Sequence, residues 1–215
     1  MIKAFIFDLD GTLVHALPDI QANINQALEN LGHKMRLSLE ETQPHVGGGA
    51  HKLASNVLGL PMDDERVMAL YHEFADVYEK NPASHGYPFP QVMDTLKKLQ
   101  QRGIKLSVVT AKPAKARLKV LTMMGFDPLL VAALSPEDGY NKKPAPDMLI
   151  ECCQRMGVDP SETWMVGDTL FDVEAGLNAK CAGVGFTMHG YQDVPEKYKD
   201  QVTEIHNFSE ILNLR

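Results

Sequence analysis

Five short apolar runs, each ending at a polar residue or a turn, are the feature that most limits the folds open to this chain. Continuous apolar runs of this length indicate strands buried on both faces, and they lie at residues 3–8, 105–110, 129–135, 163–168 and 181–186. Between the later runs, apolar residues recur with helical spacing over residues 90–102, 113–124, 144–156 and 169–178. This alternation of strands and helices predicts an α/β fold in which helices cover both faces of a parallel sheet.

One interval is too long for a single strand-helix-strand unit, which takes about 30 residues. Asp8 and Lys105 are 97 positions apart, so we expect an insertion directly after the first strand. Residues 18–32 and 63–81 each carry apolar residues along one helical face, which predicts a helical insert standing over the carboxyl end of that strand. We therefore predict two domains, a core of residues 1–14 and 85–215 and a helical cap of residues 15–84.

The composition argues against several classes of partner. With 44% hydrophobic and 23% charged residues, the chain of 215 residues is typical of a globular protein. Its 21 lysines and arginines against 28 aspartates and glutamates leave a formal charge of -7, which argues against binding to nucleic acid or to an anionic membrane. The three cysteines suggest no disulfide framework, and the first residues do not resemble a signal peptide. We therefore expect a cytoplasmic protein with reduced thiols.

Polar residues follow three of the predicted strands at the point where each strand ends. Asp8, Thr110 and Asp168 occupy these positions, and a second carboxylate, Asp10, lies two residues beyond Asp8. Ligands of open parallel sheets bind beyond the carboxyl ends of the strands, so we expect these side chains to share one crevice. Each residue alone is more typical of a helix cap. Their occurrence together favours a functional site.

The predicted crevice holds too much negative charge to be stable without compensation. Two carboxylates about 4 Å apart repel by about 4 kcal/mol at an effective dielectric constant of about 20, and Asp172 adds a further carboxylate near Asp8, Asp10 and Asp168. Either some of these groups carry protons or a cation lies among them. Oxygen ligands that leave room for water suit Mg²⁺ better than Zn²⁺, and such sites commonly take phosphate oxygens. The pattern therefore predicts a small phosphorylated substrate.

Cationic and flexible residues of the same region suit an anionic ligand. Lys143 precedes a predicted helix that opens with Pro144 and Pro146, where backbone N–H groups also favour an anion. The Thr110 hydroxyl can donate a hydrogen bond to a phosphate oxygen, and Gly11 allows the backbone to pass close to a ligand. A solvated surface charge remains the alternative for Lys143.

Four motifs resemble, in their order along the chain, those of the haloacid dehalogenase superfamily. They are "DLDGTL" (8–13), "SVVTAKP" (107–113), "KKPAPD" (142–147) and "GDTLFD" (167–172). The first motif, followed by "HVGGGA" (45–50) and "YPFPQVMDTLKKLQQRG" (87–103), is most similar to the phosphoglycolate phosphatase branch. The resemblance implies a three-layer Rossmann-like parallel sheet with an α-helical cap, and a Mg²⁺-dependent phosphatase that acts on a small phosphomonoester.

The same resemblance implies a role for each matching residue. Asp8 is expected to attack phosphorus and form an aspartyl-phosphate, and Asp10 to protonate the leaving oxygen and then activate water. The residues expected to hold the phosphoryl group are Thr110, Ala111 through its backbone N–H, and Lys143. Mg²⁺ is expected to bind Asp8, Asp168 and the backbone carbonyl of Asp10, with Asp172 supporting the site.

Several residues depart from the family pattern or keep an open role. His15 and Ala16 replace an Asp-Ser pair common after the first motif, and Ala111 replaces an asparagine in the second. These changes bear on the substrate more than on the phosphatase chemistry. A role in substrate selection and a solvated turn remain equally open for the glycine-rich cap loop of residues 44–55, with His45, His51 and Lys52. The sequence does not tell whether Lys112 faces substrate or solvent.

Two alternatives to hydrolysis remain open at this point. A phosphosugar mutase of the same superfamily would return the phosphoryl group to its substrate, although "DGTL" and the glycolate-type cap pattern favour hydrolysis. A non-catalytic module with an acidic pocket is disfavoured because Asp8, Asp10, Lys143 and Asp168 are all present. A dehalogenase is disfavoured because that chemistry needs neither Asp10 nor a magnesium site.

Overall fold

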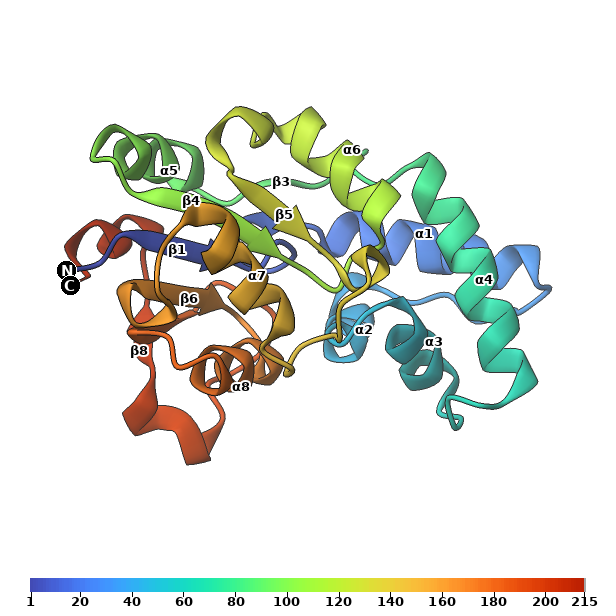
Figure 1. The fold of residues 1–215 in the computed structure, drawn as a ribbon. Helices are drawn as coiled ribbons and strands as arrows, with labels where there is room; N and C mark the ends of the chain where they lie inside the picture. Colours follow the sequence, from blue (N-terminus) through green and yellow to red (C-terminus); the bar gives the residue numbers. More distant parts are fainter. Residues whose placement is uncertain (215) are drawn as a thin grey trace.

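A six-stranded parallel sheet forms the centre of this computed structural model, which describes residues 1–214 (Figure 1). The strands are β1 (Ala4–Phe7), β4 (Lys105–Val109), β5 (Ala132–Leu134), β6 (Thr163–Gly167), β7 (Gly183–Thr187) and β8 (Thr203–Ile205). Their order across the sheet is β5-β4-β1-β6-β7-β8. This is the Rossmann order 3-2-1-4-5-6, and it reverses between β1 and β6, where such folds place their ligand. The predicted fold class is confirmed.

Each of the five predicted apolar runs contains one strand of the sheet, with one substantial change of extent. The run at 129–135 forms a strand only over Ala132–Leu134, because Asp127–Leu129 turns in a short 3₁₀ helix that includes Pro128. The strand β8 was not predicted from the sequence. It lies at the sheet edge, and its Thr203 and Glu204 are exposed, so it lacks the apolar pattern of a buried strand.

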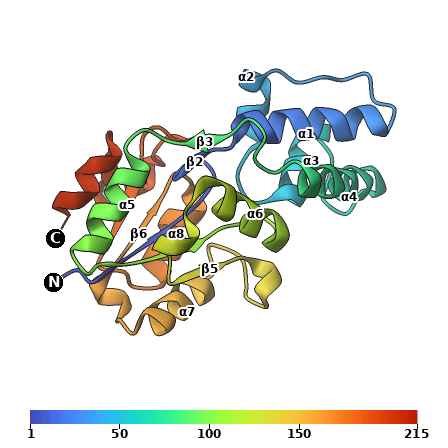
Figure 2. The same ribbon diagram turned by 90° about the horizontal axis from the view of Figure 1, so that it is seen from above.

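Alternate residues of β1 point to opposite faces of the sheet and create two packed layers. Phe5 and Phe7 pack on one face against the helices α5 (Val92–Gln101) and α6 (Ala114–Met124) and the 3₁₀ helix η6 (Phe208–Asn213). Ala4 and Ile6 pack on the other face against α7 (Asp147–Met156) and α8 (Leu170–Asn178). Figure 2 shows α5 and α7 on opposite sides of the sheet. The core is therefore a three-layer sandwich with β1 at its centre.

The core helices begin close to the predicted positions, except for α7. The predicted helix at 144–156 begins at Asp147, because Lys142 to Ala145 form a turn closed by the Ala145 N–H and the Lys142 carbonyl. Pro146 then caps the helix. Within residues 1–214, none of the helices combines the length and the apolar character needed to cross a membrane.

A helical insert of four helices lies between the first strand of the sheet and α5, beyond one end of the sheet (Figures 1 and 2). The helices are α1 (Leu17–Asn30), α2 (Leu39–Thr42), α3 (Ala50–Leu58) and α4 (Glu65–Lys80). Two short antiparallel strands, β2 (Val14–His15) and β3 (Tyr87–Pro88), pair where the chain enters and leaves the insert. The predicted domain boundaries at residues 15 and 84 remain a prediction.

Asp19 fastens the first helix of the insert to the segment that returns to the core. Its side chain is almost fully buried, and its two oxygens accept the backbone N–H groups of Ser84, His85 and Gly86, each at 2.8 Å. Hydrogen bonds to a charged acceptor are stronger than neutral ones. This contact therefore fixes the course of the chain at the base of the insert.

Candidate active site

Asp8 and Asp10 lie directly beyond the carboxyl end of β1, where the strand order of the sheet reverses. The Asp8 N–H donates to the Val166 carbonyl at 2.9 Å, so the backbone of Asp8 continues the pairing of β1 with β6. Gly11 follows with a φ of +88°, a value that L side chains rarely adopt. The sharp turn there lets both carboxylates project from the end of one strand.

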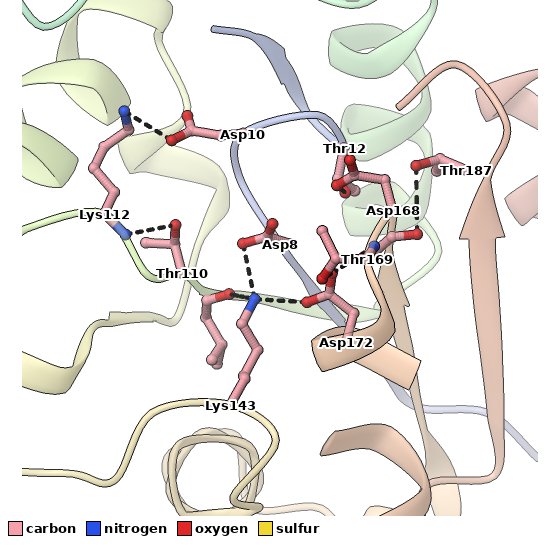
Figure 3. A network of polar contacts seen from close by, with 12 residues as sticks. Asp8, Asp10, Thr12, Thr110, Lys112, Lys143, Asp168, Thr169, Asp172 and Thr187 are labelled. Carbon is pink, nitrogen blue, oxygen red and sulfur yellow. Dashed lines mark hydrogen bonds and ion pairs between the residues drawn. The ribbon is translucent and has the colours of Figure 1, made fainter. Parts of the chain in front are cut away.

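Three buried carboxylates gather at this point. Asp8, Asp168 and Asp172 each offer an oxygen within 4.8 Å of the others. Asp168 lies beyond β6 and accepts hydrogen bonds from the Thr12 hydroxyl at 3.0 Å and the Tyr191 N–H at 2.9 Å. Figure 3 shows Asp8, at the end of β1, facing Asp168, at the end of β6, and Asp172, in the first turn of α8. The structure therefore brings Asp8 and Asp168 together, although Asp168 is fully buried and lies behind the residues that line the cavity described below.

Lys143 is the cation that balances this cluster. Its Nζ lies 2.9 Å from Asp8 Oδ1 and 2.6 Å from Asp172 Oδ1, and it donates to the Val109 carbonyl at 2.9 Å. Burial alone would lower the pKa of Lys143, but the charges of Asp172 and Asp8 hold it above its ordinary value. Lys143 therefore stays protonated between the two carboxylates.

Both carboxylate oxygens of Asp172 are bound by neighbouring protein groups. One oxygen pairs with Lys143, and the other accepts the Thr169 N–H at 3.0 Å and the Thr169 hydroxyl at 2.7 Å. These contacts form a capping box at the start of α8. Asp172 thus orients Lys143 and α8, and the supporting role that the family resemblance implies for it remains a prediction.

Two glycines make room for the Asp168 carboxylate. A Cβ atom added to Gly11 would lie 2.2 Å from Asp168 Oδ2, and one added to Gly190 would lie 2.1 Å from Asp168 Cβ. Neither distance is compatible with a real side chain, because buried hydrogen bonds from Thr12 and Tyr191 hold the Asp168 carboxylate in place. The chain therefore keeps glycine on both sides of this carboxylate.

Two of the buried carboxylates, Asp8 and Asp168, retain protons more strongly than ordinary carboxylic acids do, because their pKa values are raised. Burial raises the pKa of Asp8 to about 7, although the charge of Lys143 opposes the shift. Burial and the charge of Asp8 raise the pKa of Asp168 well above its ordinary range. The buried Oδ1 of Asp8 makes an ion pair with Lys143 but accepts no hydrogen bond from residues 1–214. An all-oxygen donor set with excess negative charge fits a divalent cation.

Asp10 points away from the carboxylate cluster and pairs with a second lysine. Its Oδ2 lies 2.9 Å from the Nζ of Lys112, whose side chain is 2% exposed. The other oxygen, Oδ1, is buried and has no hydrogen-bond partner within the described residues. Asp10 is therefore held in place by one oxygen while the other remains available to a ligand.

Thr110 and Ala111 follow the end of β4 and line the same space. Thr110 is buried, and its hydroxyl accepts the Lys112 N–H at 3.2 Å, which orders the turn after the strand. A Cβ atom on Gly49 of the insert would lie 3.5 Å from the Ala111 carbonyl, so the glycine-rich loop packs closely over this turn. The predicted phosphoryl-binding residues thus lie on the same cavity as Asp8.

A cavity of about 100 Å³ joins these groups and lies between the core and the insert. The core side includes Asp8, Asp10, Thr110, Lys112 and Lys143, among other residues. The insert closes the opposite side with the following residues: Ile20, Val46, Gly47, Gly48, Gly49, Ala50, Leu53, Phe74 and Tyr78. A ligand in this cavity would be in contact with both parts of the chain.

The histidines with open roles do not line this cavity. His15 lies in β2 against the rings of Tyr87 and Phe89, and burial lowers its pKa. His51 bonds through Nε2 to the Met62 carbonyl at 2.8 Å, which ties α3 to the following loop. Of the predicted cap loop, residues 46–50 and Leu53 reach the cavity through apolar side chains and glycine backbone.

Sequence reasoning missed the partners that hold the predicted residues in place. Thr12 lies inside the first motif, but no pattern linked its hydroxyl to Asp168, which is 156 positions away. Tyr191 supplies its N–H to Asp168 and its hydroxyl accepts the Leu17 N–H at 2.9 Å. Tyr78, on α4, lies within the predicted amphipathic helix of residues 63–81, and its helical spacing gives no indication of the contact with Lys112. These long-range contacts carry no local sequence signal.

The arrangement is similar to that of known proteins. The family model described as "Haloacid dehalogenase-like hydrolase" matches residues 5–186. An N-acetylmuramic acid 6-phosphate phosphatase of Pseudomonas aeruginosa is 30% identical over 207 residues, which cover 95% of this chain and 91% of that protein. A phosphoglycolate phosphatase of Pasteurella multocida is 33% identical over 222 residues, covering 99% of this chain and 97% of that protein.

The similarity extends to solved structures. The crystal structure of a predicted phosphoglycolate phosphatase from Haemophilus somnus superimposes with a TM-score of 0.86 at 28% sequence identity. The match covers 99% of this chain and 97% of that chain. The helical insert and the core are therefore both included in the similarity.

Proposed function

The chain belongs to the haloacid dehalogenase-like hydrolases, and on this premise we propose that it is a phosphatase acting on a small phosphomonoester. The resemblance indicated by its four motifs, and by its similarity to phosphoglycolate phosphatases, is thereby confirmed. One observation carries the proposal: Asp8 lines the cavity between the core and the insert, beside Lys143 and Asp168, and Asp10 lines the same cavity. This is the charge arrangement that phosphoryl transfer requires.

Asp8 is the proposed nucleophile. Its carboxylate attacks phosphorus while the bond from phosphorus to the leaving oxygen breaks, which leaves an aspartyl-phosphate. Lys143, 2.9 Å from Asp8 Oδ1, is positioned to offset the charge of the transferring group. The Thr110 hydroxyl and the Ala111 backbone N–H, on the same cavity, are the proposed further donors to the phosphoryl oxygens.

Asp10 is the proposed acid and base. Its Oδ1, which has no partner within residues 1–214, gives a proton to the leaving oxygen in the first step. In the second step the same oxygen takes a proton from the water that attacks phosphorus, and Asp8 is released. Lys112 holds Oδ2 at 2.9 Å, so the group that moves the proton keeps a fixed orientation.

Mg²⁺ is the proposed cofactor. Asp8 and Asp168, with the backbone carbonyl of Asp10, would hold it, and Asp172 would support the site through Lys143. When bound, the ion supplies positive charge to the phosphoryl oxygens. The raised pKa values of Asp8 and Asp168 support a cation here, because both carboxylates then gain a charge partner on ionisation.

A short, phosphoglycolate-like ester is the proposed substrate, with the insert acting as the cap over it. The cavity of about 100 Å³ holds roughly seven to ten water-sized positions, which suits a phosphoryl group with a small leaving group. A phosphoglycolate phosphatase at 33% identity supports the same class. The expected cytoplasmic location remains a prediction.

Phosphate release from a panel of phosphomonoesters, with and without Mg²⁺, tests the proposal. We expect magnesium-dependent release from small esters, 2-phosphoglycolate included, and loss of that activity in Asp8→Asn, which keeps the size of the side chain. A folded protein that released phosphate from none of the panel would contradict hydrolysis. The phosphosugar mutase alternative would then be tested by following the transfer of phosphate between two positions of a sugar phosphate.

A further inference from the structure

Lys112 is a buried cation that the carboxylate cluster does not use. It follows β4 and the turn at Thr110, and its side chain is 2% exposed. Its Nζ lies 2.9 Å from Asp10 Oδ2, donates to the Tyr78 hydroxyl of α4, and stands 4.4 Å from the centre of the Tyr78 ring. Lys112 thus lies on the cavity wall where the core meets the insert.

This ammonium group keeps both its charge and a free donor. The Asp10 carboxylate, 2.9 Å from Nζ, and the face of the Tyr78 ring, 4.4 Å from Nζ, both stabilise the charged form of Lys112. Burial raises the pKa of Tyr78 to about 12, so the phenol stays neutral and leaves the lysine charge in place. An ammonium has three N–H donors. The contacts within residues 1–214 account for two of them, Asp10 and Tyr78.

The leaving group is expected to face the part of the cavity formed by the insert, and the insert residues that line this part carry no charge. Every insert residue that lines it is apolar or glycine, apart from the phenol of Tyr78. Of the other lysines on the cavity, Lys143 is tied to Asp8 and Asp172, and Lys142 is exposed to solvent. Lys112 is therefore the buried cation of the described residues that faces this part of the cavity.

We propose that Lys112 binds a carboxylate on the leaving group and so makes the enzyme select short acidic phosphomonoesters. This rests on the proposed function, in which Asp10 contacts the leaving oxygen. Because Lys112 Nζ lies one hydrogen bond from Asp10, an anionic group one or two carbons beyond that oxygen falls within its reach. The uncharged wall of the insert offers such an anion no other partner.

The matched substrates for the test are 2-phosphoglycolate and its uncharged amide, 2-phosphoglycolamide. They differ in one charge and have nearly equal size. The readout is the ratio of their kcat/KM values in the wild type, in Lys112→Met and in Lys112→Arg. A ratio measured within one enzyme cancels any general loss caused by disturbing Asp10. Lys115→Met is the control, because it removes another ion pair between core and insert, with Glu79 at 3.1 Å, and neither residue lines the cavity.

We expect the wild type to prefer the acid, and Lys112→Met to lower that preference by about 10- to 100-fold, the value of one hydrogen bond to a charged group. Lys112→Arg should retain part of the preference, and Lys115→Met all of it. Equal losses on both substrates in Lys112→Met would overturn the proposal, because Lys112 would then act only by positioning Asp10. A wild type without preference would overturn it as well.

Product inhibition of the wild type tests the same proposal without any variant. Glycolate should inhibit more strongly than glycolamide, and equal inhibition would contradict a carboxylate site even if Lys112→Met failed to fold. Failure of the proposed function gives a different result. In that case the wild type releases phosphate from neither ester nor from the wider panel, and the role of Lys112 in selecting substrates fails with it.

Discussion

Removing the charge of Lys143 should destabilise the protein more than any other single change at a lysine. Lys143→Met keeps the length and apolar character of the side chain but leaves Asp8 and Asp172 buried without their cation. The ammonium lies 2.9 Å from one carboxylate and 2.6 Å from the other, and its side chain is 6% exposed. Each buried partner thereby loses a charge contact that solvent cannot replace.

The size of the effect follows from these distances. At an effective dielectric constant of about 20, each contact corresponds to an attraction of about 6 kcal/mol, which desolvation of the charges largely offsets. Removing one partner of a buried pair costs about 3 to 5 kcal/mol. In a chain of this length that corresponds to a decrease of the unfolding midpoint by about 6 to 20 °C.

The assay is thermal and urea unfolding of wild type and Lys143→Met in the presence of a metal chelator. Lys142→Met is the matched control, because Lys142 is the adjacent, exposed lysine and should change stability by about 0.5 kcal/mol or less. The difference for Lys143→Met should shrink as the pH falls below about 7, since Asp8 then takes up a proton and no longer needs the cation. A Lys143→Met protein as stable as the control at pH 8 would refute the electrostatic account of the cluster.

Three further predictions concern the pH dependence of stability, the hydrogen bonds of Asp19 at the base of the insert, and Gly190, which lies against Asp168. The pKa of Asp8 in the folded state, about 7, lies above its ordinary value of 3.8, so the protonation of Asp8 stabilises the fold fully below pH 3.8 and this stabilisation is lost as the pH rises through 7. Urea unfolding in the presence of a chelator should show this loss of stability, and saturating Mg²⁺ should abolish the pH dependence. Asp19→Ala should destabilise the protein by about 2 to 4 kcal/mol in thermal unfolding. Asp19→Asn should destabilise it less, because an amide oxygen at the position of Oδ1 still accepts the N–H groups of Ser84 and His85. Equal effects of the two substitutions would contradict this. Gly190→Ala should weaken Mg²⁺ binding by at least about tenfold in calorimetry, because its Cβ would collide with Asp168, and unchanged binding would count against Asp168 as a ligand.

The sheet and the ends of its strands could be predicted from the sequence because both depend on local patterns. Buried parallel strands require continuous apolar runs, and the residues that follow them, Asp8, Thr110 and Asp168, necessarily meet at one edge. The position of Lys143 at the same edge was predictable for a related reason, but its position alone left a solvated surface charge equally open, and its role came from the family resemblance. These inferences needed only the period of the pattern and the topology of a parallel sheet.

The contacts between distant segments could not be predicted in this way. Nothing local indicates that Tyr78 of α4 meets Lys112, or that Asp19 of α1 accepts hydrogen bonds from residues 84–86. Both depend on how the helical insert lies against the core, which the helical period does not determine. The edge strand β8 escaped prediction because its exposed polar residues resemble a loop. The hydrophobic period of the sequence predicts neither the packing of distant segments against one another nor the position of a polar edge strand.

The covalent intermediate on Asp8 is the central claim, and trapping it is the most direct test. The enzyme is mixed with excess 2-phosphoglycolate and Mg²⁺, quenched in acid during turnover and treated with borohydride, which reduces an aspartyl-phosphate to homoserine. Peptide mass spectrometry then locates the change. The account predicts homoserine at position 8, absent when substrate is omitted and absent in Asp8→Asn. Turnover without that product, or the product at another aspartate, would contradict it.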